Sequence, residues 1–353
     1  MRSRGLRAGA ALLLVALGRP LAGEVLGFDR PSDAFAPSPG FHLEAPVPDD
    51  PPPAPIAPAA PVSSAPAPKA PPPKLFDAKT AAVTAGVVLA APLIGYFAWW
   101  RDSARDDFSF ANERWFQEDT YAGGADKASH IFLGYIGSQL LQGIYRGFGK
   151  TPAQARGLTL AVVTVTGALI EIGDGYSQYG FSWEDITANT IGASVAFAID
   201  AWNLDDTVGL RIGLMSSPVP PPCCRYGGYG DDYSKEIYTL DLKLAGFLPR
   251  LGAKPGLARF FLLSGTYQTK GYRYSPPENR RREIGIEIGV NVREFLVALG
   301  VPETKWWGKI LLGFAKYFRI PYSGWGFRYD LNSGKWTGPN SGHGYDPGYI
   351  LYD

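Results

Sequence analysis

Side chains that can exchange protons or bind ligands gather at the start of one apolar segment. Asp126, Lys127 and His130 lie within ADKASH (125–130), directly before IFLGYIGSQLL. Residues four apart share one face of an α-helix, so Asp126 and His130 should project together. Because charge beside hydrocarbon is costly, ionisable groups in such a place are candidates for function.

A second polar group opens the apolar segment FSWEDITANTIGASVAFAIDAW (181–202). Ser182 followed by Asp185 resembles a capping box, with Asp in place of the usual Glu, so a helix should begin here. Asn189 lies four residues after Asp185 and shares its face. The polar residues again occupy the first two turns of the predicted helix.

Glycines continue both polar stripes. Gly134 and Gly137 follow His130 on its face, and Gly192 follows Asn189. Glycine lets another helix backbone approach closely, as in small-residue packing of membrane helices. We therefore expect these three glycines to mediate helix packing.

The segment between the two polar groups, 157–180, carries its acids near its end. Helices joined by short connections run antiparallel. The start of the first helix, the end of the second and the start of the third then lie at one level. The groups expected to converge there are Asp126, Lys127, His130, Glu171, Asp174, Ser182, Asp185 and Asn189.

Several carboxylates in a low-dielectric site need compensating cations or shared protons. The leading hypothesis is a non-enzymatic site that binds a lipid headgroup, a glycan precursor or a partner. A divalent cation held by carboxylate and imidazole ligands is less favoured. The rival is a membrane enzyme acting on a lipid-linked substrate, in which His130 is the general base, Asp126 orients it, and Glu171 and Asp185 hold substrate or a cation. A third alternative is a structural outer-membrane component, its polar groups holding helices together.

The elements around this site follow a clear order along the chain. Three arginines, an eleven-residue apolar run and small residues mark the start as a secretory signal, without a Cys for lipid attachment after it. The expected organisation is a signal peptide (1–23), a Pro/Ala-rich spacer (24–77), a transmembrane helix (78–100), a helical unit (101–205) and a β-rich unit (206–353).

The β-rich unit is predicted from residues of alternating polarity. Strands are expected within 208–217, 238–248 and 282–295, where REIGIEIGVNVREF places isoleucines on one face. A helix is expected at 306–318 and an extended segment at 318–331. Five or six candidate strands are fewer than the smallest single-chain barrels contain, which favours an antiparallel sheet with one face covered over part of an outer-membrane barrel.

The predicted fold class is therefore α+β and membrane-associated, with about four helices followed by an antiparallel β-rich unit. The formal net charge of the 353 residues is +1, which speaks against a general nucleic-acid binder. Cys223 and Cys224 are neighbours and cannot join distant segments, so no disulfide framework is expected. His42 and His343 lie in Pro- and Gly-rich stretches and receive no role.

The polar motifs also carry a family resemblance over roughly residues 120–203. DKASHIFLGYIGSQLL and ALIEIGDGYSQYGFSWEDITANTIGA resemble the YfiM-like predicted periplasmic lipoproteins and, more distantly, the VanZ-like membrane proteins. The resemblance implies a cell-envelope context, and some VanZ-like members are linked to glycopeptide resistance. The Pro-rich spacer and the β-rich half depart from the family patterns. The matching residues are Asp126, Lys127, His130, Glu171, Phe181, Ser182, Asp185, Asn189 and Gly192.

Two signals disagree about the side of the membrane on which ADKASH lies. A signal peptide followed by one spanning helix places it in the cytoplasm. The loop containing Arg146, Lys150 and Arg156 has no acids, which argues that this loop is cytoplasmic and ADKASH is outside. We expect an extracytoplasmic site in the cell envelope.

Overall fold

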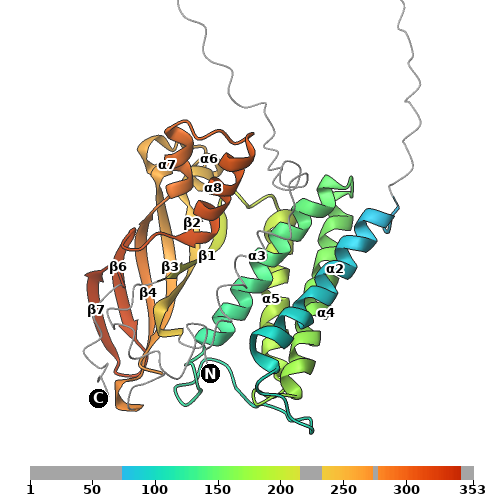
Figure 1. Ribbon diagram of the computed structural model, residues 1–353. Coiled ribbons are helices and arrows are strands. Elements are labelled where there is room, and N and C mark those ends of the chain that lie inside the picture. Colours follow the sequence, from blue (N-terminus) through green and yellow to red (C-terminus); the bar gives the residue numbers. More distant parts are fainter. Residues whose placement is uncertain (1–73, 215–232, 273–276, 343–353) are drawn as a thin grey trace, which may run out of the picture. The chain divides into compact units, whose positions relative to one another are not determined.

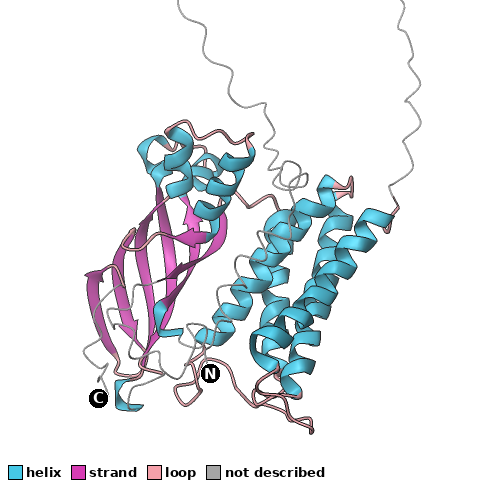
Figure 2. Ribbon diagram, in the orientation of Figure 1, coloured by secondary structure: helices cyan, strands magenta, loops and turns pink. Residues whose placement is uncertain are grey.

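The computed structural model describes residues 74–214, 233–272 and 277–342. Within these residues the chain is α+β, with seven α-helices and one seven-stranded sheet (Figures 1 and 2). The predicted signal peptide, all of the spacer before residue 74, both cysteines, His42 and His343 lie outside the described residues.

Each predicted helical segment of the first half forms a helix. The first is α2 (Ala78–Gly95), which continues as the π-helical turn η1 (Tyr96–Trp100). It is followed by α3 (Ala125–Gly147), α4 (Pro152–Gly175) and α5 (Trp183–Ala201). In α4, Thr151 and Gln154 form a reciprocal capping box and proline occupies the first turn, so local sequence fixes the start of this helix. α5 packs against both α3 and α4 (Figure 1).

Two of the described helices are long and apolar enough to cross a membrane. They are Ala78–Trp100 and Pro152–Gly175, with mean hydropathies of 1.9 and 1.5. This criterion rests on length and composition, and core helices of soluble proteins also meet it. α3 and α5, which carry most of the predicted polar site, are not among them.

The sheet has the strand order β5-β1-β2-β3-β4-β6-β7. All neighbouring pairs are antiparallel except β1 and β5, which are parallel, so the sheet is mixed and the expectation of a purely antiparallel unit is wrong. The bounds are β1 Val208–Leu214, β2 Glu236–Lys243, β3 Phe261–Lys270, β4 Arg281–Val290, β5 Phe318–Arg319, β6 Gly324–Asp330 and β7 Lys335–Asn340.

Two predicted strands end earlier than expected because helices follow them. β2 gives way to α6 (Leu244–Arg250), and β4 gives way to α7 (Val292–Ala298). At α7 the side chain of Asn291 accepts a hydrogen bond from the backbone N–H of Glu294, so it caps the helix and ends the strand. The predicted helix at 306–318 is present as α8 (Trp306–Tyr317).

The sheet buries its polar face and exposes its apolar one. In β4 the isoleucines at 284, 286 and 288 are 44%, 64% and 62% exposed, whereas Glu283 and Glu287 are buried. We had expected the sheet to have one face covered; the covered face is the charged one. An alternating sequence defines two faces but does not say which of them becomes the interior.

A hydrophobic core joins the helices to one end of the sheet. Phe132 and Tyr135 of α3 and Ile199 of α5 pack with Ile212 of β1 and Tyr238 of β2. Apolar residues of α3 and α5 therefore meet the outer surface of the first two strands, and this contact orients the start of α3 relative to the sheet.

Candidate functional site

Close packing of α3 against α5 sets the geometry of the polar site. A Cβ atom at Gly134 would lie 2.2 Å from the carbonyl oxygen of Asn189, and one at Gly192 would lie 2.0 Å from that of Ile131. Any larger residue would push the two backbones apart. Gly137 differs, since nothing lies within 4 Å of its Cβ position, so the packing role expected of it is wrong.

Lys127 lies at the centre of the site. Its ammonium group donates to Asp126 Oδ2 at 2.8 Å, to Asp185 Oδ1 at 2.6 Å and to Glu113 Oε2. The lysine side chain is 2% exposed, so these interactions are shielded from water. We call Glu113, Asp126, Lys127, His130 and Asp185 the acidic cluster.

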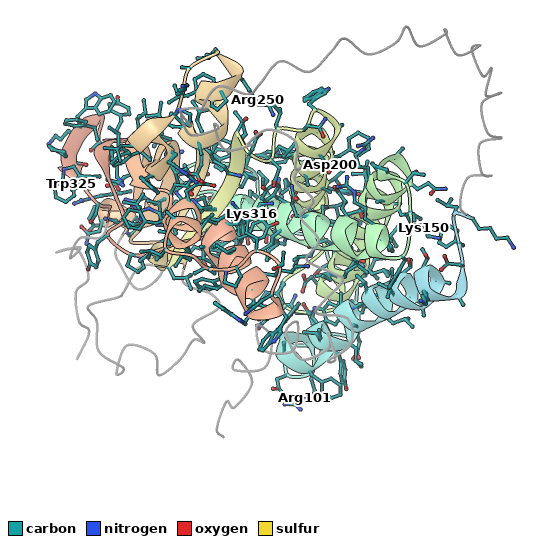
Figure 3. The ribbon with its side chains drawn as sticks, turned by 90° about the horizontal axis from the view of Figure 1, so that it is seen from above. Arg101, Lys150, Asp200, Arg250, Lys316 and Trp325 are labelled. Carbon is teal, nitrogen blue, oxygen red and sulfur yellow. The ribbon has the colours of Figure 1, made fainter. Side chains whose placement is uncertain are left out.

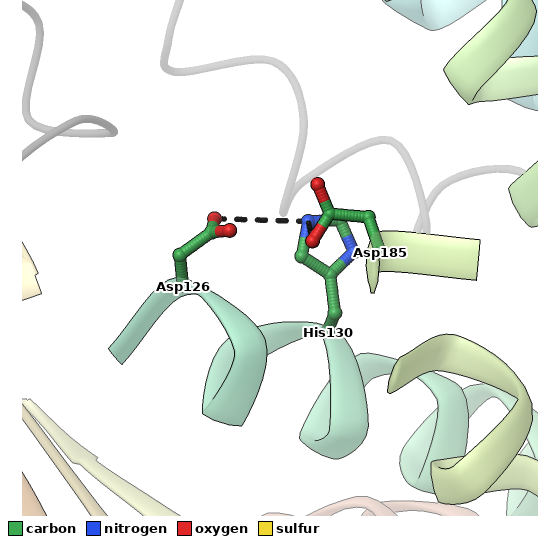
Figure 4. Close-up of side chains that lie close together, drawn as sticks. All are labelled: Asp126, His130 and Asp185. Carbon is green, nitrogen blue, oxygen red and sulfur yellow. Dashed lines mark ion pairs between the residues drawn. The ribbon is translucent and has the colours of Figure 1, made fainter. Parts of the chain in front are cut away.

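His130 lies one turn along α3 from Asp126, at the partly exposed side of the cluster (Figure 4). Its Nε2 atom is 3.7 Å from Asp126 Oδ1 and 3.5 Å from Asp185 Oδ1. Its Nδ1 atom is 3.0 Å from the side-chain amide nitrogen of Asn189. In this orientation the amide donates to Nδ1, which places the ring proton on Nε2, beside the carboxylates. Both ring nitrogens therefore face protein groups.

Two members of this network come from segments that the sequence did not single out. Glu113 lies in the connection before α3, and Tyr233 lies in the short 3-10 turn η4 (Tyr233–Lys235). The Tyr233 hydroxyl donates to Asp126 Oδ1 at 2.6 Å. Neither residue belongs to a helical stripe, so spacing could not reveal them; the only sequence signal was an acid in an aromatic-rich loop at Glu113.

Burial and neighbouring charges shift the pKa values of the three carboxyl groups in the cluster, which lie outside the two apolar candidate spans. Burial and repulsion by Asp185 raise the pKa of Glu113 to about 7. Burial and repulsion by Asp126 raise the pKa of Asp185 to about 6. Burial opposes the charged form of Asp126 as well, but the adjacent His130 and Lys127 outweigh it and hold the pKa of Asp126 well below its ordinary value.

The pKa of Lys127 is also set by competition between burial and neighbouring charges. Burial alone would lower the pKa of this ammonium group, but attraction by Asp126, Asp185 and Glu113 outweighs burial and raises the pKa above its ordinary value. Lys127 is therefore a permanent cation, and the carboxylates around it carry the variable charge of the cluster.

The remaining predicted residues lie beside the cluster or make their contacts elsewhere. Glu171 is buried and accepts a hydrogen bond from the backbone N–H of Ser182 at 3.1 Å. The Ser182 hydroxyl accepts from the backbone N–H of Asp185 at 3.2 Å and caps α5. Asp174, which we expected to join the others, instead accepts from the indole N–H groups of Trp99 and Trp100.

Asp126, His130 and Asp185 form a group with the composition of a metal site. One ligand atom from each lies within 4.8 Å of the others. Carboxylate and imidazole ligands suit several divalent ions. The Lys127 ammonium group, however, already bonds both aspartates, so an ion would have to compete with a permanent positive charge at the same oxygen atoms.

Comparison with known families finds a match in the part of the chain that contains the acidic cluster. A family described as predicted periplasmic lipoprotein (DUF2279) matches residues 112–201, which contain every member of the acidic cluster. The match names neither the YfiM-like nor the VanZ-like grouping. No curated protein and no solved structure gave a match. The family description agrees with the cell-envelope localisation expected from the sequence.

Proposed function

We propose that this chain is a membrane-associated protein of the cell envelope whose acidic cluster binds a positively charged group of an envelope lipid or glycan precursor. A primary ammonium group, as in ethanolamine headgroups and amino sugars, has the required chemistry. The proposal concerns binding and assigns no reaction to the cluster.

The excess of carboxylates in the cluster is the observation that supports the proposal most. Glu113, Asp126 and Asp185 all bond the single ammonium group of Lys127. Glu113 and Asp185 have raised pKa values because burial disfavours their charged forms and because a neighbouring aspartate repels each of them, and the attraction of Lys127 does not offset these effects. A bound cation would supply the missing positive charge and displace protons.

Exposure indicates the side from which a ligand would approach. The side chains of Glu113 and His130 are 20% and 22% exposed, whereas Asp126, Lys127 and Asp185 are between 2% and 7% exposed. A ligand amine would therefore meet Glu113 first, with the other charges below it. Charge-assisted hydrogen bonds to such carboxylates are among the stronger polar contacts in proteins.

The enzyme hypothesis receives less support from the ring geometry of His130. A general base needs a nitrogen lone pair directed at the proton it removes. Here Nδ1 faces Asn189 and Nε2 faces two carboxylates. We therefore favour a binding role, in which the imidazole orients and balances the carboxylates.

Calorimetric titration of the purified full-length chain tests the proposal. The probes are dihexanoyl phosphatidylethanolamine for a lipid source, glucosamine for a glycan source, and dihexanoyl phosphatidylglycerol as a headgroup without an amine. We expect one amine probe to bind and the glycerol probe not to bind. Binding should strengthen as pH rises through 6 to 7, because the carboxylates with raised pKa values then ionise.

A pair of matched variants in the same loop makes the test specific. Glu113→Gln should weaken amine binding by about tenfold, as expected for one charge-assisted hydrogen bond. Glu118→Gln removes an equal charge from an exposed position and should leave binding unchanged. Equal binding of all three probes, or equal effects of the two variants, would contradict the proposal.

A further inference from the structure

The exposed face of the sheet is a continuous apolar surface. We call it the outer face and define it by Leu240, Leu263, Ile286, Ile288, Trp325 and Phe327, each at least 44% exposed. One row of the ladder joins Leu240, Gly265, Ile286 and Phe327, and the next joins Leu242, Leu263, Ile288 and Trp325. No charged side chain interrupts either row. Trp325 lies at the margin of the sheet farthest from α2–α5 (Figure 3).

The opposite face of the same strands contains paired charges. Arg211 bonds Asp241, and Glu287 bonds both Arg319 and Arg328. Arg319 and Glu287 are 0% and 1% exposed. A soluble sheet with one solvated face has the reverse pattern, with apolar residues inside. The arrangement here matches the polar interior and apolar exterior of transmembrane β-barrels.

Contacts across the sheet show that it is rolled. Arg319 belongs to β5 and Glu287 to β4, and the order of the sheet places three strands between them. In a flat sheet four strand spacings would separate the two by about 19 Å, farther than one arginine side chain extends. Arg319 also donates to the carbonyl oxygen of Ser341, just beyond β7, at 3.0 Å. The charged face is therefore the inside of the roll.

Aromatic residues border the outer face at one end. The next row of the ladder on this face contains Tyr267, Ile284, Tyr329 and Trp336. Tyr267 contacts the loop before α3, where its hydroxyl donates to the carbonyl oxygen of Gly123 and its ring packs against Phe116. Tyr329 and Trp336 pack against each other farther along the row, and Trp336 is exposed, which resembles the aromatic girdle at a membrane interface.

We propose that the outer face contacts the hydrocarbon of a lipid bilayer, with Tyr329 and Trp336 at the interface. β3 and β4 have 10 residues each, the length of a tilted strand that crosses a bilayer. A protein partner fits this surface less well than lipid does. Protein interfaces contain about one hydrogen bond per 100–200 Å², and the two central rows have almost no polar side chain that could form one. This proposal does not depend on the ligand of the acidic cluster.

Site-directed labelling of the full-length chain tests this surface. Cys223 and Cys224 are first changed to Ser. Ile286→Cys or Ile288→Cys then carries a polarity-sensitive nitrobenzoxadiazole label in vesicles of phosphatidylethanolamine and phosphatidylglycerol. We expect blue-shifted emission that lipids with doxyl groups on their acyl chains quench strongly. Glu278→Cys, at the exposed turn before β4, is the matched control and should remain unshifted and unquenched.

Each outcome of the labelling decides the proposal. Emission typical of water at both 286 and 288 overturns it. Blue-shifted emission that doxyl lipids do not quench, and that grows with protein concentration, overturns it in favour of contact between two copies of the chain. A circular dichroism spectrum equal to that of the unlabelled chain verifies that each variant is folded. None of the labelled positions belongs to the acidic cluster, so failure here leaves the amine-binding proposal to its own test.

Discussion

The chain buries charged groups in two regions, and the two regions balance their charges differently. Inside the rolled sheet, Glu287 lies between Arg319 and Arg328, and its charges are sealed from water. In the acidic cluster three carboxylates bond one lysine, and the side chains of Glu113 and His130 remain about one-fifth exposed. Both regions bury charged side chains. The cluster at the start of α3 differs from the sheet because it has more carboxylates than cations and is partly open to solvent.

The comparison separates structural charges from charges available for function. A fully paired, sealed ion pair has nothing left to offer a ligand and is costly to break. A cluster with an excess of acid responds to protons and to cations, because either one relieves repulsion. The two regions should therefore differ in how stability responds to mutation and to pH.

The largest expected effect is in the sheet. Glu287→Ala leaves Arg319 and Arg328 buried without their shared carboxylate. We expect a loss of about 3–5 kcal/mol in the free energy of unfolding. Denaturant unfolding in detergent measures it, with the exposed Glu278→Ala as control. Equal stability of the two variants would show that the sheet interior is not sealed.

A smaller and pH-dependent effect is expected at the centre of the cluster. Lys127→Met removes the ammonium group that bonds Glu113, Asp126 and Asp185. At pH 8 the free energy of unfolding should fall by about 2–3 kcal/mol, because three ionised carboxylates then lose the cation that they all bond. Near pH 5 the loss should shrink as the carboxylates take up protons. A loss of the same size at both pH values would remove the distinction between the two regions.

Packing under the cluster can be altered without changing any charge. Gly134→Ala places a methyl group against the backbone of Asn189, so α5 must shift away from α3 at a cost of about 1–2 kcal/mol. Gly137→Ala is the matched control on the same helix, where the position is open and alanine's helix propensity should stabilise by about 0.5–1 kcal/mol. Thermal unfolding compares them, and a gain for both variants would show that the helices do not meet closely at Gly134.

The smallest effect is expected for Glu113→Gln and depends on the direction of the pKa shift. The folded-state pKa of Glu113 is raised from 4.5 to about 7, so the folded state holds this proton more tightly than the unfolded chain does. The resulting stability is complete below pH 4.5 and is lost as pH rises through 7. Glu113→Gln should therefore be more stable than wild type by about 1 kcal/mol at pH 8. Denaturant unfolding of both proteins at pH 5 and pH 8 measures this difference. If the variant is less stable than wild type at pH 8, the raised pKa of Glu113 is contradicted.

Local patterns predicted the helices and part of the site. Ser182 and Asp185 marked the start of α5, four-residue spacing placed His130 beside Asp126, and Asn189 contacts His130. These features depend on residues close in sequence, which periodicity reports directly. Glu113 and Tyr233 reach Lys127 and Asp126 through tertiary structure, and no spacing rule connects them.

The sheet shows a different limit of sequence patterns. Alternation in β4 separated the isoleucines from Glu283 and Glu287, but either set could form the interior. The choice depends on Arg319 and Arg328, which pair with Glu287 from strands much later in the chain. The early ends of β2 and β4 were missed because apolar residues continue the alternation into α6 and α7.

The contact of Arg319 with Glu287 and Ser341 has a consequence for the order of assembly. Contacts between distant parts of a chain form late, because loop closure must precede them. The roll cannot close until the last strands of the described chain are available. Until then Glu287 has neither arginine, and the half-built sheet presents an unpaired carboxylate on its concave side. The strands as far as Ser341 must therefore be synthesised before the concave, charged face of the sheet can be buried.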